Sequence, residues 1–420
     1  MTKGMMKFVG FRGPLILILL VGCAATLWGG DVPRKPRVRA ITAFVSIDRS
    51  AFAKQIQDTL TMLRKAKSAF EKGGYEVQTI RITTQPFPQY TRGMTKAEAL
   101  EFFKGLDALS KKESFLANVG PAMLNDQDDS AIDLLADILV STDLNTSLVI
   151  AADDGIHWNA IRAAAKTIKY VEEHSANGGH NFDFAAAAFV PPYTPFFPAT
   201  NHNGPGHQFS VGLEGGAFVA DVFTESRGDP RIARELLSGK LAEHARSLEA
   251  IALQVEKDSG WSYMGLDATP APGPDSSIGA AIQQFTGTKF GSSGTLTAAA
   301  IITDAVRSIP VKRVGYSGLM LPPLEDSVLA QGWSERNYNI DSLLAYSAVC
   351  GTGLDTIPLP GEVSQQQLER IIGDVASLAF KWHKPLAARL IPAPGKKAGD
   401  RTDFDFGIPG FPNVILQPLP

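Results

Sequence analysis

The regular alternation of strand-like and helix-like segments in the first part of the chain constrains the fold most strongly. Short runs of β-branched and apolar residues predict strands, and apolar residues spaced three or four apart, as at Ile56, Leu60 and Leu63, predict helices. The predicted order is strand Val38–Ile47, helix Ser50–Lys72, strand Val77–Ile82, helix Thr95–Phe103, strand Phe115–Val119, helix Ser130–Val140, strand Ser147–Ala152 and helix Gly155–Glu173. Because such an order brings parallel strands together, it argues for a mostly parallel sheet with helices outside it.

A segment without helical spacing, Asn177–Gly216, interrupts this alternation and is rich in Gly, Pro, His and aromatic residues. Strands are predicted at Phe182–Val190 and Phe209–Leu213, and the long loop between them is a place where binding groups tend to lie. Beyond it we expect helices at Asp229–Lys257, Ser276–Phe285, Thr295–Arg307, Asp341–Ala348 and Ser364–His383, and strands at Trp261–Leu266, Val311–Tyr316, Ala388–Pro392 and Val414–Leu416. No boundary divides this part, so residues 38–420 are predicted to form one large domain.

The first 30 residues are predicted to be an export signal. A basic start precedes the apolar run Pro14–Gly22, which is too short for a comfortable membrane span. The run ends in Leu-Val-Gly-Cys23, which resembles the lipobox of bacterial lipoproteins. We therefore expect lipidation at Cys23, export, and a periplasmic or cell-envelope protein held at the membrane by its N-terminus. The alternatives are cleavage after Ala25 and an uncleaved anchor extended to Trp28. Residues 31–37 are predicted to form a short basic tether.

Net charge and cysteine content argue against a nucleic-acid partner and against a disulfide-stabilised fold. The formal net charge of -3 gives no reason to expect a nucleic-acid partner. The chain has two cysteines, and Cys23 lies in the predicted signal, so the remaining domain holds the single thiol of Cys350 and no disulfide framework.

Cys350 follows an apolar segment and sits on a turn made by Gly351, Thr352 and Gly353. Glycines let the backbone fold sharply and let a substrate approach, so a thiol shown on such a turn is a candidate nucleophile. The alternative is a small buried apolar residue, which free cysteine often is. Pro358 and Pro360 are expected to stop any regular element after the turn.

Several blocks, in a fixed order, resemble a largely uncharacterised prokaryotic family known as domain of unknown function 711. The blocks are Pro195–His202, Leu266–Gly273, Gly291–Thr295, Gly315–Pro322 with Glu325 and Asp326, and Cys350–Asp355. The resemblance covers about Val38 to the C-terminus and implies an α/β barrel like that of the glycyl radical enzymes related to pyruvate formate-lyase. In that fold two parallel half-sheets with outer helices close around a central loop that carries a cysteine, and Cys350 matches the family's cysteine motif. The lipoprotein-like signal departs from the family.

No glycyl radical is expected, because the tail Gly399–Pro420 lacks the motif that would carry one. His202 ends the first block and is a candidate general acid or base. Its neighbours His180 and His207 match no standard metal-ligand spacing, so no metal is predicted and the sequence specifies no cofactor.

Carboxylates beside Gly or Pro turns could share acid–base work or bind a cationic substrate. They are Asp267, Asp275, Glu325, Asp326 and Asp355. Asp267 and Asp355 are preferred, because they lie in the two blocks that resemble the family most clearly. Each could instead cap a helix or turn.

Gly291-Ser292-Ser293-Gly294-Thr295 precedes a predicted helix and could hold an anion on free amides, or simply cap that helix. Ser317 and Gly318, in the Gly315–Pro322 block, are further candidates for binding the substrate.

Two hypotheses about function follow. The first is an exported, lipid-anchored enzyme that acts on a small polar metabolite by thiol-dependent lyase or acyl-type chemistry, with Cys350 as the thiol and His202 or Asp355 moving protons. The alternative is a lipoprotein that binds a small ligand without catalysis. The oligomeric state is left open by the sequence.

Overall fold

The computed structural model describes residues 34–127, 129–273, 275–407 and 410–419. These residues belong to one compact unit, Pro33–Pro420. The predicted signal, the lipidation site at Cys23 and the first residues of the tether lie outside the described residues.

Five parallel strands form the first half-sheet, in the order β1-β2-β3-β4-β6. They are β1 (Arg37–Val45), β2 (Val77–Thr84), β3 (Leu116–Pro121), β4 (Asn145–Ala152) and β6 (Phe184–Ala188), and the short β5 (Gly155–Ile156) pairs with the end of β4. The connections are α1 (Phe52–Lys72), α2 (Phe87–Thr91), α3 (Lys96–Glu113), α4 (Ile132–Ser141), α5 (Trp158–His174) and the 3-10 helix η1 (Ala176–Asp183). This half reproduces the predicted alternation.

The second half-sheet is built from the rest of the chain and runs in the opposite direction. Its strands are β7 (Gln208–Glu214), β8 (Ser262–Ala271), β9 (Gly353–Pro360) and β10 (Leu386–Ala393), with β7 parallel to β8 and β9 parallel to β10. Its helices are α6 (Gly216–Ser226), α7 (Pro230–Ser259), α8 (Ile278–Thr286), α9 (Thr295–Ser308), α10 (Ser327–Ser334), α11 (Ile340–Ser347) and α12 (Gln365–Trp382).

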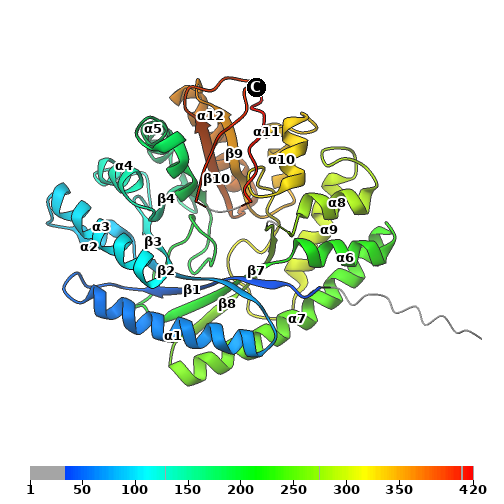
Figure 1. Ribbon diagram of the computed structural model, residues 1–420, viewed down its shortest axis with the longest axis horizontal. Helices are drawn as coiled ribbons and strands as arrows, with labels where there is room; N and C mark the ends of the chain where they lie inside the picture. The colour runs from blue at the N-terminus through cyan, green and yellow to red at the C-terminus, as the bar shows by residue number, and fades with distance from the viewer. Residues whose placement is uncertain (1–33, 128, 274, 408–409, 420) are drawn as a thin grey trace, which may run out of the picture. The chain divides into compact units, whose positions relative to one another are not determined.

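Two antiparallel seams join the half-sheets into a ring. At one seam β1 pairs with β7, and at the other β6 pairs with β10. Figure 1 shows the helices arranged around the outside of the strands. The predicted α/β barrel-like fold of two parallel half-sheets with outer helices is therefore confirmed.

Loops complete the ring where the strand order ends, between β8 and β9. Arg313 forms a single parallel bridge with Leu266 of β8. Beyond it, the Thr352 hydroxyl donates a hydrogen bond of 2.8 Å to the Leu319 carbonyl. The backbones of Gly318 and Gly351 lie against each other, and neither has room for a Cβ. Glycine is needed here because only a bare backbone allows this approach.

The inner and outer faces of the strands carry different side chains. The main hydrophobic core lies between the strands and the helices, with large residues such as Phe44, Phe103 and Phe184 fully buried in it. A smaller cluster lies inside the ring and contains alanines from β6, β8 and β10 together with Phe196, Tyr316 and Met320. Because alanines fill little of the interior, the ring has room for a segment of chain and for a cavity.

The segment between β6 and β7, residues 189–207, enters the ring. The Thr42 hydroxyl of β1 donates to the Pro195 carbonyl at 2.7 Å, and the Asn118 amide of β3 donates to the Pro198 carbonyl at 2.7 Å. These bonds hold the Pro195–His202 block against the inner face of the first half-sheet. The long loop predicted from its composition is thus an internal loop.

Three sequence predictions about strands were wrong. Pro358 and Pro360 were expected to stop regular structure, but both belong to β9, paired with Ile391 and Ala393 of β10. β9 ends the strand order, and an edge strand tolerates proline because its outer side needs no N–H. The other two, Val311–Tyr316 and Val414–Leu416, make only the isolated bridges of Arg313 and Ile415.

The Gly318–Gly351 contact predicts a stability effect. In Gly351→Ala the new Cβ would lie 2.7 Å from the Gly318 Cα and 3.0 Å from the Tyr316 carbonyl. We expect a loss of about 1–3 kcal/mol in the free energy of unfolding, measured by urea denaturation. The control is Gly105→Ala in α3, where a Cβ meets nothing within 4 Å and a gain of about 0.5–1 kcal/mol is expected. Equal stability of Gly351→Ala and the native chain would contradict this account of ring closure.

Candidate functional site

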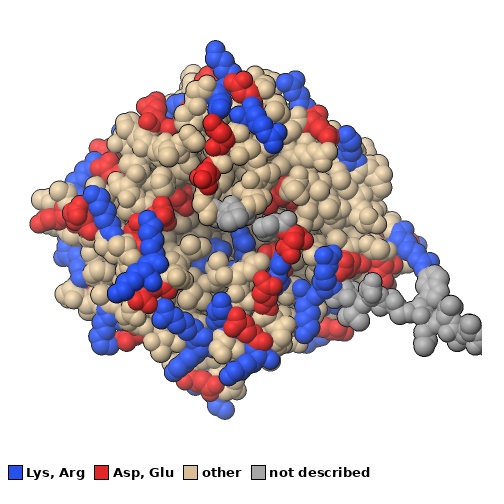
Figure 2. All heavy atoms as spheres, in the orientation of Figure 1, with Lys and Arg blue, Asp and Glu red and all other residues tan. Residues whose placement is uncertain are grey.

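A cavity of about 690 Å³ lies inside the ring and is lined by residues from both half-sheets and from the internal loop. Its ionisable lining residues are Arg39, Arg81, Asp143, His180, Asp183, Glu325, Asp355, Arg389 and Asp405. Figure 2 shows blue and red side chains around a hollow near the centre of the face seen in Figure 1. The volume suits a small organic molecule, and the charges favour a polar one.

Arg389 of β10 is the centre of a buried charge cluster in this cavity. Its Nη1 lies 2.9 Å from Asp355 Oδ1 and 3.0 Å from Glu325 Oε1. Its Nε donates to the Phe182 carbonyl at 3.0 Å, and the guanidinium lies 4.0 Å from the centre of the Phe182 ring. With a hydrogen bond, a stacked ring and two carboxylates around it, Arg389 is held in one position.

A β-bulge turns Asp355 into the cavity. Leu354 pairs with Ala388 and Ile357 with Leu390, so two residues of β9, Asp355 and Thr356, face one residue of β10. Thr356 has a φ of 45°, a left-handed conformation that a β-branched residue rarely adopts. Bulges commonly re-aim side chains near functional sites, and strain of this kind persists only where the surroundings enforce it.

Burial raises the pKa of Asp355 to about 6; the positive charge of Arg389 opposes the rise and the charge of Glu325 adds to it. A carboxyl with a pKa in this range can exchange a proton near neutral pH, as a general acid or base must.

A second bulge turns Arg39 inward at the opposite side of the ring. Val38 pairs with Leu213 and Ala40 with Gly212, which leaves Arg39 as the extra residue of β1. Its guanidinium lies 3.9 Å from Glu325 and 4.0 Å from Glu214.

Arg81 of β2 lies nearby, only 6% exposed, with its Nε donating to the Thr79 hydroxyl at 3.0 Å. Its guanidinium lies 5.1 Å from the centre of the Phe197 ring on the internal loop.

His180 and Asp183 form another pair at the cavity wall. His180 Nδ1 lies 3.3 Å from Asp183 Oδ2, and this hydrogen bond raises the pKa of His180. Burial raises the pKa of Asp183. The pair can hold or release a proton and lies on η1, next to Phe182, whose carbonyl accepts from Arg389.

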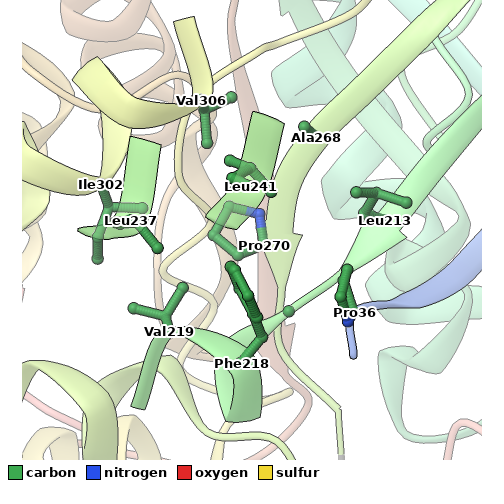
Figure 3. Close-up of a pocket in the computed structure, with 11 residues that line it drawn as sticks. Pro36, Leu213, Phe218, Val219, Leu237, Leu241, Ala268, Pro270, Ile302 and Val306 are labelled. Atoms are coloured by element: carbon green, nitrogen blue, oxygen red, sulfur yellow. The ribbon is translucent and has the colours of Figure 1, made fainter. Parts of the chain in front are cut away.

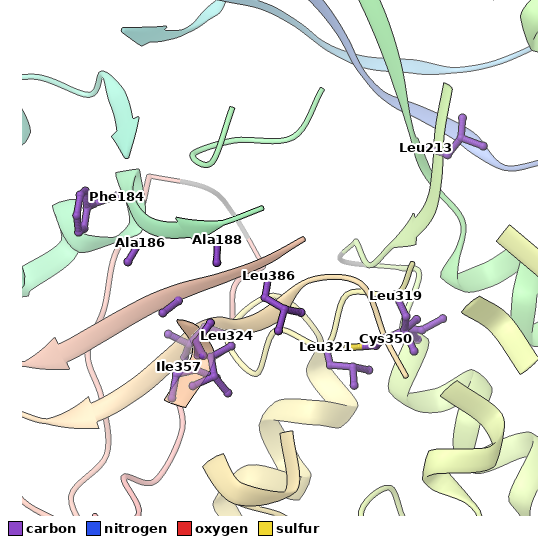
Figure 4. Packing of buried hydrophobic residues seen from close by; sticks show 14 of the residues in the cluster. Phe184, Ala186, Ala188, Leu213, Leu319, Leu321, Leu324, Cys350, Ile357 and Leu386 are labelled. Carbon is purple, nitrogen blue, oxygen red and sulfur yellow. The ribbon is translucent and has the colours of Figure 1, made fainter. Parts of the chain in front are cut away.

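The structure places Cys350 in the hydrophobic core and not on the internal loop. It is 1% exposed, its Sγ lies 3.7 Å from the Ser347 hydroxyl, and it does not line the cavity. Figure 4 shows it close to Leu319 and Leu321. The expectation that Cys350 lies on a loop inside the ring is therefore corrected: residues 189–207, which contain no cysteine, form an internal loop, and Cys350 lies in the core outside the cavity.

His202 and Asp267 are buried at structural positions. His202 is 2% exposed, donates from Nε2 to the Val45 carbonyl at 3.1 Å, and has a pKa lowered by burial. Asp267 accepts hydrogen bonds from Thr269 and from the amides of Tyr316 and Ser317, while burial raises its pKa to about 6. Asp267 thus ties the Gly315–Pro322 block to β8. Neither residue lines the cavity.

The two loops expected to bind the substrate also lie outside the cavity lining. Residues Gly291, Ser292, Ser293 and Gly294 lead into α9, and the Thr295 hydroxyl accepts from the Gly291 amide at 3.1 Å. Ser317 and Gly318 belong to the junction that completes the ring, where Gly318 N donates to Thr269. Of the residues expected to act as catalytic or substrate-binding groups, Asp355 lines the cavity, whereas Cys350, His202, Asp267 and the two loops do not.

The other carboxylates divide between the cavity and the scaffold. Glu325 lines the cavity, whereas Asp326 accepts from the first amides of α8 and α10 and so joins two helix starts. Asp275 pairs with Arg37.

Sequence reasoning missed the three arginines. Arg81 and Arg389 each stand alone in a strand of otherwise uncharged residues, whereas Arg39 shares β1 with Arg37. A single charge in a strand that must be buried on both faces is the signal that could have identified Arg81 and Arg389.

A second cavity, shown in Figure 3, is lined by apolar side chains and has room for about one water, at about 10 Å³. Within the described ranges, no group of three histidine, cysteine or carboxylate side chains could hold a metal ion, and no helix there is long and apolar enough to cross a membrane.

Comparison with known proteins identifies relatives over most of the chain. The family model described as "Uncharacterised ACR (DUF711)" matches residues 33–405. A UPF0210 protein of Pyrobaculum arsenaticum is 29% identical over 401 residues, covering 88% of each chain. One from Syntrophobacter fumaroxidans is 28% identical over 400 residues, covering 87% of this chain and 88% of the relative.

Among solved structures, the chain is similar to the anaerobic ribonucleotide reductase from Thermotoga maritima in complex with dATP and CTP. The TM-score is 0.43 at 9% identity, covering 90% of this chain and 79% of that one. The likeness concerns the fold alone.

The burial of Cys350 predicts slow alkylation. In Cys23→Ser the thiol of Cys350 is the only one in the chain. Because that side chain is 1% exposed, we expect iodoacetamide to label it slowly in the native protein and at the rate of a free thiol after denaturation in urea. Fast labelling of the native protein, with a thiol pKa well below the free value of about 8.5, would contradict the placement of Cys350 in the core.

Proposed function

This chain belongs to the DUF711 family, and we propose that its ring cavity binds a small polar organic molecule to which, or from which, Asp355 transfers a proton. The observation that carries the proposal is a cavity of about 690 Å³ lined by a buried carboxyl whose pKa lies at about 6. A large pocket with convergent charged groups and a perturbed carboxyl is the usual form of an active site.

The surroundings of Asp355 suit proton transfer. Arg389 at 2.9 Å orients the carboxylate, and the stacked Phe182 ring and carbonyl keep Arg389 in place. In its ionised form Asp355 would act as a base and take a proton from the bound molecule. In its protonated form it would act as an acid and return one. Such proton transfer supports elimination, hydration or isomerisation. The lyase hypothesis drawn from the sequence is therefore kept. Thiol-dependent and acyl-type chemistry is left out, because Cys350 lies in the core beside Leu319 and not at the cavity.

The second candidate is a binding protein without catalysis. The contacts of Arg389 with both Asp355 and Glu325 favour it, since buried ion pairs also occur as purely structural networks that perturb pKa values. The two candidates differ in whether replacing Asp355 removes a reaction or only changes affinity.

We also propose export and lipidation at Cys23. The support is the basic start, the apolar run and the Leu-Val-Gly-Cys23 sequence. An uncleaved N-terminal membrane anchor is the alternative form of this proposal.

Replacing Asp355 tests the catalytic proposal. A library of small organic acids, amides and phosphate esters is first screened for compounds that raise the melting temperature, and the compounds found are assayed for turnover. Turnover should rise with pH through about 6, because the base must be ionised, and then level off. Asp355→Asn should lower kcat by about 10²–10⁴-fold and abolish this pH dependence.

The matched control is Asp133→Asn, whose carboxyl is 75% exposed on α4 and should leave turnover unchanged. Full turnover in Asp355→Asn with the same pH profile would sink the catalytic role. Unchanged binding without any turnover in either protein would favour the binding-protein candidate.

The localisation proposal has its own test. In a bacterial host, the full chain should incorporate labelled fatty acid and sediment with membranes, whereas Cys23→Ser should incorporate none. Cys350→Ser is the control, since that cysteine is buried in the folded domain and should leave lipidation intact. Incorporation that persists in Cys23→Ser would refute lipidation at this position.

A further inference from the structure

Arg81 differs from the other cavity arginines in forming no ion pair with any described residue. It is 6% exposed, and among the described residues its side chain makes one hydrogen bond, from Nε to the Thr79 hydroxyl. No ion pair of Arg81 occurs in the described part of the chain, whereas Arg389 pairs with two carboxylates and Arg39 contacts two. The end of the Arg81 guanidinium therefore offers N–H donors that no described residue accepts, at the wall of the cavity.

A mostly buried cation without an ion-pair partner is costly, because much of its hydration is lost and little opposite charge replaces it. Burial lowers the pKa of Arg81 to about 9, and the positive charges of Arg39 and Arg389 add to this while Glu325 opposes it. Arg81 thus stays charged at neutral pH. Its cost is met if a negatively charged group enters the cavity and accepts its free N–H groups, which the planar guanidinium offers in a fork suited to two oxygens.

We propose that Arg81 is the anion-binding group of the cavity and that the bound molecule carries a carboxylate or phosphate group. This inference rests on the proposed function, since it names the substrate class for the same site. The anionic oxygens lie on the Arg81 guanidinium beside the Phe197 ring, with Arg39 close enough to add its field. The internal loop thereby sets the position of the anion, because Phe197 packs on Arg81 at 5.1 Å.

The rest of the molecule lies along the apolar part of the lining. Phe196, Met320 and the alanines Ala185 and Ala387 form this surface. It leads to the Asp355 carboxyl on the β9 bulge. The molecule that binds in the cavity is therefore a small organic acid or phosphate ester with a carbon skeleton, and not an inorganic ion alone.

Anion binding to the full chain, measured by calorimetry in a chloride buffer at neutral pH, tests the inference. The probes are malonate for the carboxylate source, inorganic phosphate for the phosphate source, and malonamide as an uncharged analogue. At least one anion should bind the native chain, and malonamide should not. Arg81→Gln should lower the affinity for that anion at least about tenfold. The surface control Arg246→Gln should bind as the native chain does.

Arg81→Gln should also fold, with an unchanged or higher melting temperature, because it removes an unpaired buried charge. Arg81→Lys keeps the charge without the fork and should bind with intermediate affinity. Absence of binding by both anions, or equal affinity in the native chain and Arg81→Gln, would overturn the inference.

The two proposals fail in different ways. Asp355→Asn should keep or strengthen anion binding, because it removes a negative charge and none of the anion's contacts. Arg81-dependent binding without any turnover would therefore support the anion site and count only against catalysis by Asp355.

Discussion

The two antiparallel seams, β1 with β7 and β6 with β10, are the contacts on which the rest of the structure depends. They turn two open parallel half-sheets into a ring with a helix-covered outside and a separate inside. The chain must pass from one half to the other between β6 and β7, and it does so through the interior. The internal loop, the cavity beside it and the exposure of Arg81 and Asp355 to that cavity all follow from this closure.

The interior is unusual in holding charge where a closed ring would be filled by apolar side chains. Two β-bulges place Arg39 and Asp355 inside, and alanines on β6 and β10 leave space for them. Arg389 neutralises part of the negative charge of Asp355 and Glu325, and Arg81 pairs with no carboxylate in the described ranges. Both bulges and the left-handed Thr356 reduce the regularity of the sheet, which is expected where a site is built at the expense of stability.

Much of the fold could be predicted from the sequence, because the spacing of apolar residues identifies helices and strands that bury a face in the core between them. Thr95, Asp229 and Ser364, the predicted first residues of three helices, are the N-caps of α3, α7 and α12. Most of the site could not be predicted. A bulge depends on the pairing of two strands that are distant in the sequence. The sequence of either strand alone therefore does not predict that the Asp355 side chain points into the cavity. Glycine turns also drew attention to Cys350, although that turn serves the packing of Gly351 on Gly318.

The most direct test of the account is the titration of the Asp355 carboxyl by infrared difference spectroscopy, comparing the native chain with Asp355→Asn. The protonated carboxyl of Asp267 is present in both proteins, so it cancels in the difference. If Asp355 transfers protons, a protonated-carboxyl band that belongs to it should disappear as the pH rises through about 6. A difference spectrum without that band at pH values just below 6 would show that Asp355 is an ordinary ionised partner of Arg389, and would contradict its role in proton transfer.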